Sequence, residues 1–214
     1  MNPIVKRAVH RLLPRRLLVS SGVGDRAQVA LTFDDGPHPD HTERILKVLR
    51  QERVKATFFL IGGEVEKYPA LVKAMAWEGH ALGNHAFSHR RLDQVPPAAW
   101  ADEIERTTAL IERAAGVSTR LFRPPYGAVT WPLLGYAWRR HWTIVLWSVD
   151  SGDSRAGASP DVVRDAVRSA RARDIVLLHE DYSHTVEALG TIIRDVKARG
   201  LSCATVPQLM DGSR

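Results

Sequence analysis

Two adjacent carboxylates, Asp34 and Asp35, follow the apolar run 28–33 and precede Gly36-Pro37. Aspartate is common in solvated turns, which is the plain interpretation of such a pair. An adjacent pair can also divide two chemical roles, because one carboxylate can bind a cation while the other stays free to accept a proton. The pair is therefore a candidate for a metal ligand beside a general base.

Two histidines, His85 and His89, are four positions apart. If they lie on a helical turn, this spacing lets both imidazoles reach one metal ion. A chance pair on a surface turn is the alternative, because the chain holds nine histidines. Two histidines and one aspartate would leave coordination positions open for water, which is typical of catalytic rather than structural zinc.

Two further residues could orient a carboxylate or move a proton. Arg123 begins the stiff, proline-containing loop 123–127. An arginine held there can fix a neighbouring carboxylate and keep it ionised, although a surface arginine is the alternative. His179 ends the apolar run 175–178, where a buried core histidine is the usual interpretation. With Asp153 available from the loop of the neighbouring strand, His179 is also a candidate general acid.

Most of the six tryptophans fall at helix-face or strand positions, where core packing is expected. Tyr126 and Trp147 stand beside the polar residues above and are candidates for a substrate groove, with Trp131 as a third. The single cysteine, Cys203, excludes an internal disulfide and a multi-thiolate zinc site. Its apolar neighbours indicate a position in the core.

These side chains must be brought together by the fold, and two kinds of segment alternate along the chain. Runs rich in β-formers occur at 28–33, 56–61, 80–83, 119–122, 143–149, 175–178 and 202–206. Helical periodicity occurs at 42–51, 98–115, 160–171 and 186–199. About seven strand–helix units argue for an α/β fold, either a doubly wound parallel sheet or a closed barrel. The count of seven units and the lack of a Gly-rich phosphate loop favour a barrel. This barrel would be smaller than the ordinary eightfold one of about 250 residues.

In either architecture the active site lies at the carboxyl ends of the parallel strands. The candidate residues named above follow those ends. We therefore expect them to gather at one rim of the sheet rather than to scatter over the surface.

The composition, with 44% hydrophobic and 25% charged residues, excludes disorder and collagen-like repeats. Five of the six net positive charges fall in residues 1–24, which contain no acid. The rest of the chain is close to neutral, so no nucleic-acid-binding function is expected. We expect a basic extension over residues 1–24 and a single domain over residues 25–214. The sequence does not indicate an oligomeric state.

Apolar residues at helical spacing over 4–13 predict an amphipathic helix that ends at Pro14. This segment docks on the domain, makes peripheral membrane contact through residues 1–20, or is disordered. The uninterrupted apolar segment of a signal peptide is missing. A cytoplasmic location, or one peripheral to the cytoplasmic membrane, is therefore expected.

Five motifs in this order resemble those of the NodB-homology polysaccharide deacetylases, carbohydrate esterase family 4. They are Thr32-Phe33-Asp34-Asp35-Gly36-Pro37, His85-Ala86-Phe87-Ser88-His89, Arg123-Pro124-Pro125-Tyr126-Gly127, Asp150-Ser151-Gly152-Asp153 and Leu177-Leu178-His179. The resemblance covers residues 28–206 and implies a distorted (β/α)7 barrel, in agreement with the strand count. It also implies a metal-dependent hydrolase that removes N-acetyl groups from an amino-sugar glycan, oligosaccharide or glycoside.

The resemblance implies how the metal and the base are held. Asp35, His85 and His89 would bind a divalent metal, zinc or another such as Co²⁺. Asp34 would take a proton from the attacking water. Arg123 would tether Asp34.

The resemblance further implies how the oxyanion and the leaving group are handled. The backbone N–H of Tyr126 would stabilise the oxyanion. His179 would be the general acid, with Asp153 holding its imidazole, and Lys55 would support Asp153. Leu177 would help to shape the pocket for the acetyl methyl group.

Two positions depart from the family pattern. Ala86 replaces the usual Ser or Thr, so one hydrogen bond behind the metal ligands is expected to be missing. Ser154 replaces the usual Trp, which predicts a different or more open groove. Two other functions stay open: hydrolysis of a non-sugar linear or cyclic amide, and silent glycan binding without turnover.

Overall fold

The computed structural model describes residues 13–14 and 16–211, so the helix predicted at 4–13 lies outside the described residues except for Leu13. The described strands form one nine-stranded sheet in which every strand pair is parallel. They are β1 (Leu18–Val19), β2 (Gln28–Gly36), β3 (Thr57–Leu60), β4 (Ala81–Asn84), β5 (Leu121–Phe122), β6 (Thr143–Val145), β7 (Val149–Asp150), β8 (Ile175–His179) and β9 (Ser202–Cys203). Their order is β1-β6-β5-β4-β3-β2-β8-β7, with β9 beside β2.

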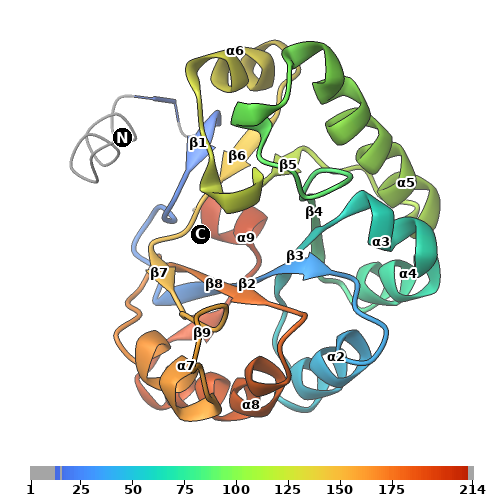
Figure 1. Cartoon of the computed structure of the whole chain (residues 1–214). Helices are drawn as coiled ribbons and strands as arrows, with labels where there is room; N and C mark the ends of the chain where they lie inside the picture. The colour runs from blue at the N-terminus through green and yellow to red at the C-terminus, as the bar shows by residue number, and fades with distance from the viewer. Residues whose placement is uncertain (1–12, 15, 212–214) are drawn as a thin grey trace.

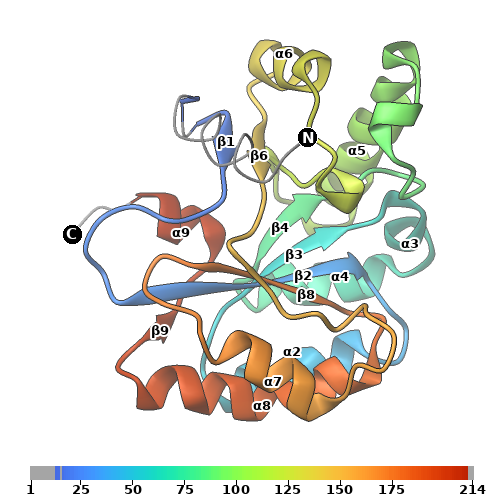
Figure 2. The same cartoon turned by 60° about the vertical axis from the view of Figure 1, so that its left-hand side comes forward.

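Helices cover most of the outside of the curled sheet, and the last one lies within the curl, as Figures 1 and 2 show. They are α2 (Thr42–Gln51), α3 (Gly62–Lys67), α4 (Pro69–Trp77), α5 (Arg106–Ala115), α6 (Trp131–Arg139), α7 (Pro160–Val167), α8 (Ser183–Ala198) and α9 (Val206–Asp211). The predicted distorted α/β barrel is confirmed. Across the part of the chain that the structure describes, no helix is both long and apolar enough to cross a membrane.

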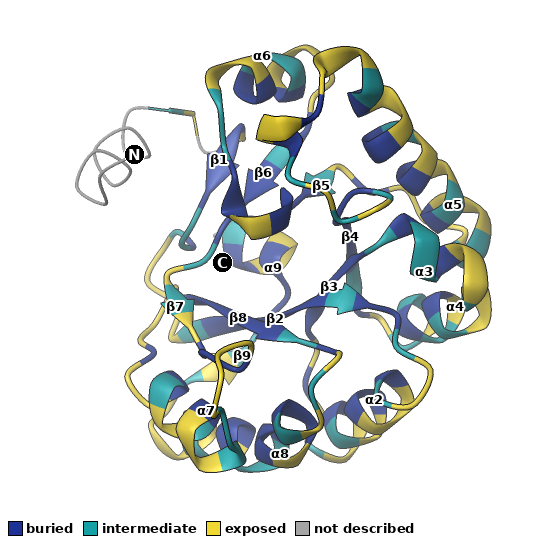
Figure 3. Cartoon of the chain, in the orientation of Figure 1, coloured by how far each residue is buried: buried dark blue, intermediate teal, exposed yellow. Residues whose placement is uncertain are grey.

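The core has two main layers, because the strands are buried on both faces. Outside the sheet, apolar faces such as Ile45 and Leu49 of α2 pack against strand residues such as Phe33. Inside the curl, Val206 and Leu209 of α9 pack with residues of β1, β2, β3 and β6. Figure 3 shows the central strands, such as β2 and β8, and the inward faces of the helices as mostly buried. Helix α9 therefore fills one end of the barrel.

The strand predicted at 143–149 is wrong as a single strand, because its backbone partners change along its length. Leu146 N–H still donates to the carbonyl of Val19 on β1, whereas Ser148 N–H donates to Ile175 on β8. Residues 143–150 thus leave β6, which lies between β1 and β5, and cross to the opposite edge of the sheet as β7. The strand predicted at 202–206 also ends early, because Val206 begins α9.

The expected boundary after residue 24 does not coincide with the edge of the sheet. Within that segment β1 pairs with β6, and Leu18 and Val19 are buried. Gly22 N–H then donates to the carbonyl of Arg173. Residues 16–22 therefore belong structurally to the barrel.

The predicted helices differ from the observed ones mainly at their ends. The segment predicted at 98–115 contains a π-helix, Ala101–Glu105, before α5 begins. Helix α5 ends where the predicted segment 98–115 ends, because Gly116 caps it with φ of 69°. Helices α3, α4 and α6 were not among those assigned from periodicity.

Candidate active site

Strands β2 and β8 position the residues at the centre of the site. Their register aligns Thr32 with Leu177 and Asp34 with His179. Alternate residues of a strand lie on the same face, so these four side chains share one face at the carboxyl end of the sheet. The base and acid implied by the family resemblance thus lie on adjacent strands.

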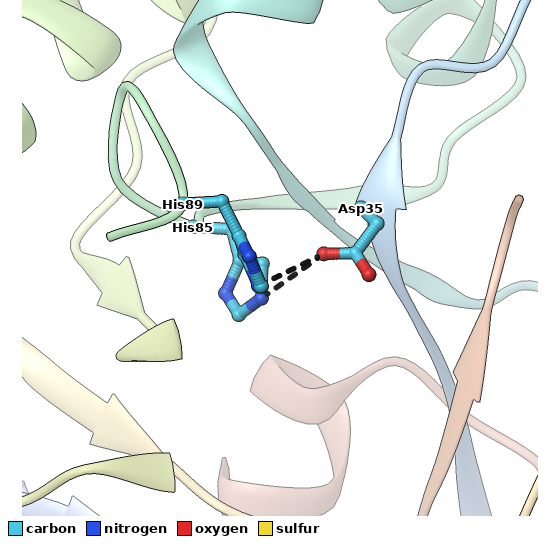
Figure 4. A group of neighbouring side chains, drawn as sticks. All are labelled: Asp35, His85 and His89. Atoms are coloured by element: carbon cyan, nitrogen blue, oxygen red, sulfur yellow. Dashed lines mark ion pairs between the residues drawn. The ribbon is translucent and has the colours of Figure 1, made fainter. Parts of the chain in front are cut away.

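Asp35, His85 and His89 converge as a cluster whose ligand atoms lie within 4.8 Å of one another. Asp35 Oδ1 is 3.4 Å from His85 Nε2 and 3.2 Å from His89 Nε2, as drawn in Figure 4. That oxygen is buried and has no hydrogen-bond partner among the described residues. Burial opposes ionisation of Asp35, but the facing imidazoles outweigh it and lower its pKa to about 2. An orphaned anionic oxygen facing two imidazole nitrogens fits a divalent cation.

The ring of His85 is oriented for this role. Its Nδ1 lies 2.7 Å from the backbone carbonyl of Arg123, which leaves Nε2 directed to the cluster. A carbonyl partner behind a metal-binding histidine fixes both tautomer and ring orientation.

The two histidines meet through a loop rather than a helical turn, which departs from the geometry supposed for their spacing. Ala86 and His89 both adopt left-handed backbone, with φ of 64° and 55°. Ala86 N–H donates to Asn84 Oδ1 at 2.8 Å. The Asn84 amide in turn donates to Ile104 O at 2.7 Å and to Thr108 Oγ1 at 2.9 Å. These backbone conformations bend the segment so that both rings face Asp35.

Asp34 is held by Arg123 as the family resemblance implies. Arg123 Nη1 lies 2.6 Å from Asp34 Oδ1 and 2.8 Å from Thr32 Oγ1. The guanidinium is fully buried, lies 4.0 Å from the Phe59 ring centroid and donates to Val145 O at 3.1 Å. The other Asp34 oxygen is 3.6 Å from His85 Nε2, so Asp34 borders the metal cluster.

His179 and Asp153 form the second proton-handling pair. His179 Nδ1 is 2.7 Å from Asp153 Oδ1, and His179 N–H donates to Asp153 Oδ2 at 2.7 Å. Thr185 Oγ1 also donates to Oδ2, at 2.8 Å. Burial disfavours the imidazolium, but the Asp153 carboxylate outweighs it and, with Asp34 and Asp35, raises the pKa of His179 to about 9. The Asp153 carboxylate thus favours the imidazolium form of His179.

The aromatic candidates lie around this centre. The ring of Tyr126 is 61% exposed, lies 4.8 Å from that of His89, and its backbone is left-handed. Its backbone N–H donates to no other residue in the described ranges 13–14 and 16–211, which leaves it available. Trp147 packs against Gly127, where a Cβ would lie 2.9 Å from the indole. Trp131 is exposed at the start of α6.

Lys55 does not support Asp153. It precedes β3, at the amino end of that strand, and its ammonium donates to the carbonyl of Glu78. The implied assignment is wrong, because Asp153 lies among residues at the opposite, carboxyl end of the sheet.

Sequence reasoning missed Glu103, a buried residue of the π-helix Ala101–Glu105. Its carboxylate accepts the N–H groups of Phe87 and Ser88 at 3.0 and 2.9 Å and the Ser88 hydroxyl at 2.6 Å. Glu103 therefore anchors the segment between the two metal-site histidines. No local motif marks it, because the contact spans about fifteen positions of chain.

Sequence reasoning also missed Glu180, whose only signal was its place directly after His179. It is fully buried, and a Cβ at Gly36 would overlap its carboxyl. Thr42 donates to Oε2, whereas Oε1 has no partner among the residues described. Burial raises the pKa of Glu180 to about 8. Glu180 therefore packs as a neutral acid beneath the loop that follows Asp35.

Comparisons with known proteins agree with this geometry. The polysaccharide deacetylase family matches residues 21–138. A peptidoglycan-N-acetylglucosamine deacetylase from Bacillus cereus is 36% identical over 198 residues, covering 91% of this chain and 72% of the relative. A chitooligosaccharide deacetylase from Bradyrhizobium is 35% identical over 202 residues, covering 87% of this chain and 92% of the relative.

A solved structure of a peptidoglycan N-acetylglucosamine deacetylase with a bound hydroxamate-type benzamide superposes with a TM-score of 0.89 at 35% identity. The match covers 100% of this chain and 99% of that one. Both the sequence family and the whole barrel are therefore shared, over more than the five motifs alone. The chain belongs to the polysaccharide deacetylases of carbohydrate esterase family 4, a family of metal-dependent enzymes.

Proposed function

We propose that this chain is a zinc hydrolase that removes N-acetyl groups from N-acetylglucosamine-containing glycans, with peptidoglycan and chitooligosaccharides as the substrate classes to test. The observation that carries the proposal is that two proton-handling groups, Asp34 and His179, lie on adjacent strands beside one metal cluster. The Asp34–Arg123 pair borders the cluster of Asp35, His85 and His89. The substrate classes come from the names of the relatives.

The three ligands would hold the ion with positions left for water and the acetyl oxygen. When bound, zinc polarises the acetyl carbonyl and lowers the pKa of water. Asp34 accepts a proton from the attacking water, while Arg123 fixes the carboxylate. The water oxygen bonds to the carbonyl carbon, and Tyr126 N–H donates to the developing oxyanion.

The acid completes the reaction. His179 Nε2 gives its proton to the amide nitrogen as the C–N bond breaks, which releases acetate and the free amine. Asp153 holds Nδ1 and stabilises the imidazolium before transfer. Leu177 would contact the acetyl methyl group, and Tyr126 and Trp147 would flank the sugar.

Two alternatives give different results in one assay. A silent glycan-binding domain would release no acetate from any substrate. Such a domain would also have no need for a general base and a general acid together. A hydrolase of non-sugar amides would be inactive on glycans but active on simple amides. Acetate release from peptidoglycan fragments, chitooligosaccharides and simple amides, with chelator and then with added Zn²⁺, separates the three.

The two aspartates should behave differently in that assay. Asp35→Asn removes a charged ligand and should lower zinc content, measured by elemental analysis. Asp34→Asn should keep the metal and lower kcat by about 10²–10⁴, the usual contribution of a general base. Asp161→Asn, at the exposed start of α7, is the matched control and should change neither quantity. Equal metal loss in the Asp34 and Asp35 variants would refute the division of roles.

A further inference from the structure

A second polar surface lies at the end of the barrel opposite the active site. The amino ends of β1, β6 and β5 adjoin there, since Thr143 donates through its hydroxyl to Arg16 O and through its N–H to Arg120 O, both at 2.8 Å. Helix α6 ends beside them. All these strands are parallel to β2 and β8, whose carboxyl ends carry the active site. We call this surface the basic rim, defined by Arg16, Arg120, Trp138, Arg139, Arg140, His141 and Trp142.

The basic rim is assembled from two stretches of sequence that contain no acid. Residues 1–24 hold no Asp or Glu, and neither do residues 113–149. Pairing of β1 with β6 brings these stretches together. Across residues 13–14 and 16–211, neither Arg16 nor Arg139 forms an ion pair. Positive charge at this rim is therefore largely uncompensated.

One carboxylate does face the rim. Glu105 Oε1 is 3.8 Å from Arg140 Nη1 and also accepts the Tyr136 hydroxyl at 2.9 Å. It offsets one of the four arginines. The remaining three leave a net positive surface.

The rim also contains a cavity of about 270 Å³. Its lining residues are Arg16, Leu17, Ala137, Trp138, His141, Trp142 and Thr143. The Arg16 guanidinium lies 4.7 Å from the ring centroid of Trp138, which is 48% exposed. A cation beside a half-exposed indole suits an anionic oxygen attached to a partly apolar group.

We propose that the basic rim binds the surface of an anionic phospholipid membrane, with a lipid phosphate seated at Arg16 and Trp138. Uncompensated arginines attract anionic headgroups, and tryptophan partitions to the membrane interface. Residues 1–15, which precede Arg16 in the sequence, carry four further cations. A neutral glycan would gain little from this charge. Binding here would turn the active site away from the membrane, toward a glycan beyond it.

Vesicle sedimentation tests the proposal on the full chain. With phosphatidylglycerol mixed into phosphatidylcholine, the protein should pellet, and Arg16→Gln with Arg139→Gln should weaken the partition coefficient at least tenfold. The matched control is Arg44→Gln with Lys47→Gln on the exposed face of α2, which lies far from α6 in both Figures 1 and 2. The control should bind like the wild type, because it removes the same charge elsewhere. Trp138→Ala should weaken binding without changing net charge.

Several outcomes would overturn the proposal. The first is equal binding to pure phosphatidylcholine and to the mixed vesicles, and the second is wild-type binding by the Arg16 and Arg139 double variant. The third is a loss of binding that occurs only in Lys6→Gln with Arg7→Gln. The fourth is tighter binding to duplex DNA than to anionic vesicles. Acetate release from a soluble chitooligosaccharide should be unchanged in all rim variants. That readout keeps failure of this proposal distinct from failure of the proposed deacetylase function.

Discussion

Two buried glutamates at the active site have opposite electrostatic surroundings. Burial disfavours ionisation of Glu103, but the Ser88 hydroxyl, backbone N–H groups and Arg90 outweigh it and lower its pKa. Glu180 receives one side-chain donor, from Thr42, and burial raises its pKa to about 8. Glu103 thus holds its loop as an anion, whereas Glu180 fills its place as a neutral acid.

Glu180→Gln should remove a pH-dependent loss of stability. Because the folded-state pKa of about 8 exceeds the ordinary 4.5, the contribution of Glu180 to stability is full below pH 4.5 and is lost as the pH rises through 8. Glutamine has no proton to lose, so the Tm of the variant should fall less than that of the wild type between about pH 5 and 9. Thermal unfolding at a fixed zinc concentration measures this.

Glu103→Gln is the control with the opposite sign. Its lowered pKa means that the carboxylate stabilises the fold above pH 4.5 and loses that effect as the pH falls. This variant should therefore unfold at a lower Tm near pH 7 and approach the wild type in acid. Parallel Tm curves for the wild type and Glu180→Gln would contradict our interpretation of Glu180.

Asp153→Asn should move the alkaline limb of kcat to lower pH. The general acid must be protonated when the amine leaves, and Asp153 is the main group that holds the pKa of His179 near 9 against burial. Losing that charge should shift the limb by about 1–3 pH units and lower the maximum rate, at unchanged metal content. Asp150→Asn is the control, since Asp150 binds Gly152 N–H and Arg155 rather than His179. An unmoved limb in Asp153→Asn would exclude it as the partner.

At the scale of elements, strands and helices with a clear period could be predicted. Helix α2 occupies the predicted residues 42–51, and β2 and β8 begin where expected. The polar residues at their ends consequently fell at the right rim. Strand β1 could not be found in this way, because two residues carry no period and their partner lies more than a hundred positions away on β6.

For the active site too, only the residues that follow periodic elements could be placed from the sequence. Asp34, Asp35 and His179 end strands, so their positions were predictable from apolar runs. The approach of His85 to His89 depends on left-handed backbone within the loop, and Glu103 reaches that loop from a π-helix. The spacing of residues predicts neither the left-handed loop backbone nor the contact of Glu103, because tertiary packing determines both.

The role of β1 can be measured with one truncation. Val19→Ala should destabilise the protein by about 1.5–2.5 kcal/mol, because it removes buried methyl groups and leaves a cavity beside β6. Val117→Ala, at a 44% exposed position, should cost about 0.5 kcal/mol or less. Urea unfolding of both variants gives the comparison. Equal, small costs would mean that β1 is only loosely attached to the sheet.

At the scale of the whole molecule, the metal cluster joins distant parts of the barrel. Asp35 follows the apolar run of β2, whereas His85 and His89 follow β4, and β3 lies between these strands. Arg123, after β5, bonds to the Asp34 carboxylate and accepts from the His85 ring. An ion bound here would connect the ends of β2 and β4 and, through Arg123, that of β5, so metal binding and folding should be coupled.

Zinc should therefore raise the Tm of the wild type in proportion to the logarithm of its free concentration. At one hundred times the dissociation constant, binding to the folded state alone adds about 2.7 kcal/mol, which corresponds to about 5–10 °C for a chain of this size. Scanning calorimetry over a zinc series, with chelator as the zero point, measures the shift. Asp35→Asn should lose most of the shift because it lacks a ligand, whereas Asp34→Asn should keep it despite its lower kcat. A shift that persists undiminished in Asp35→Asn would mean that zinc stabilises the barrel from some other site.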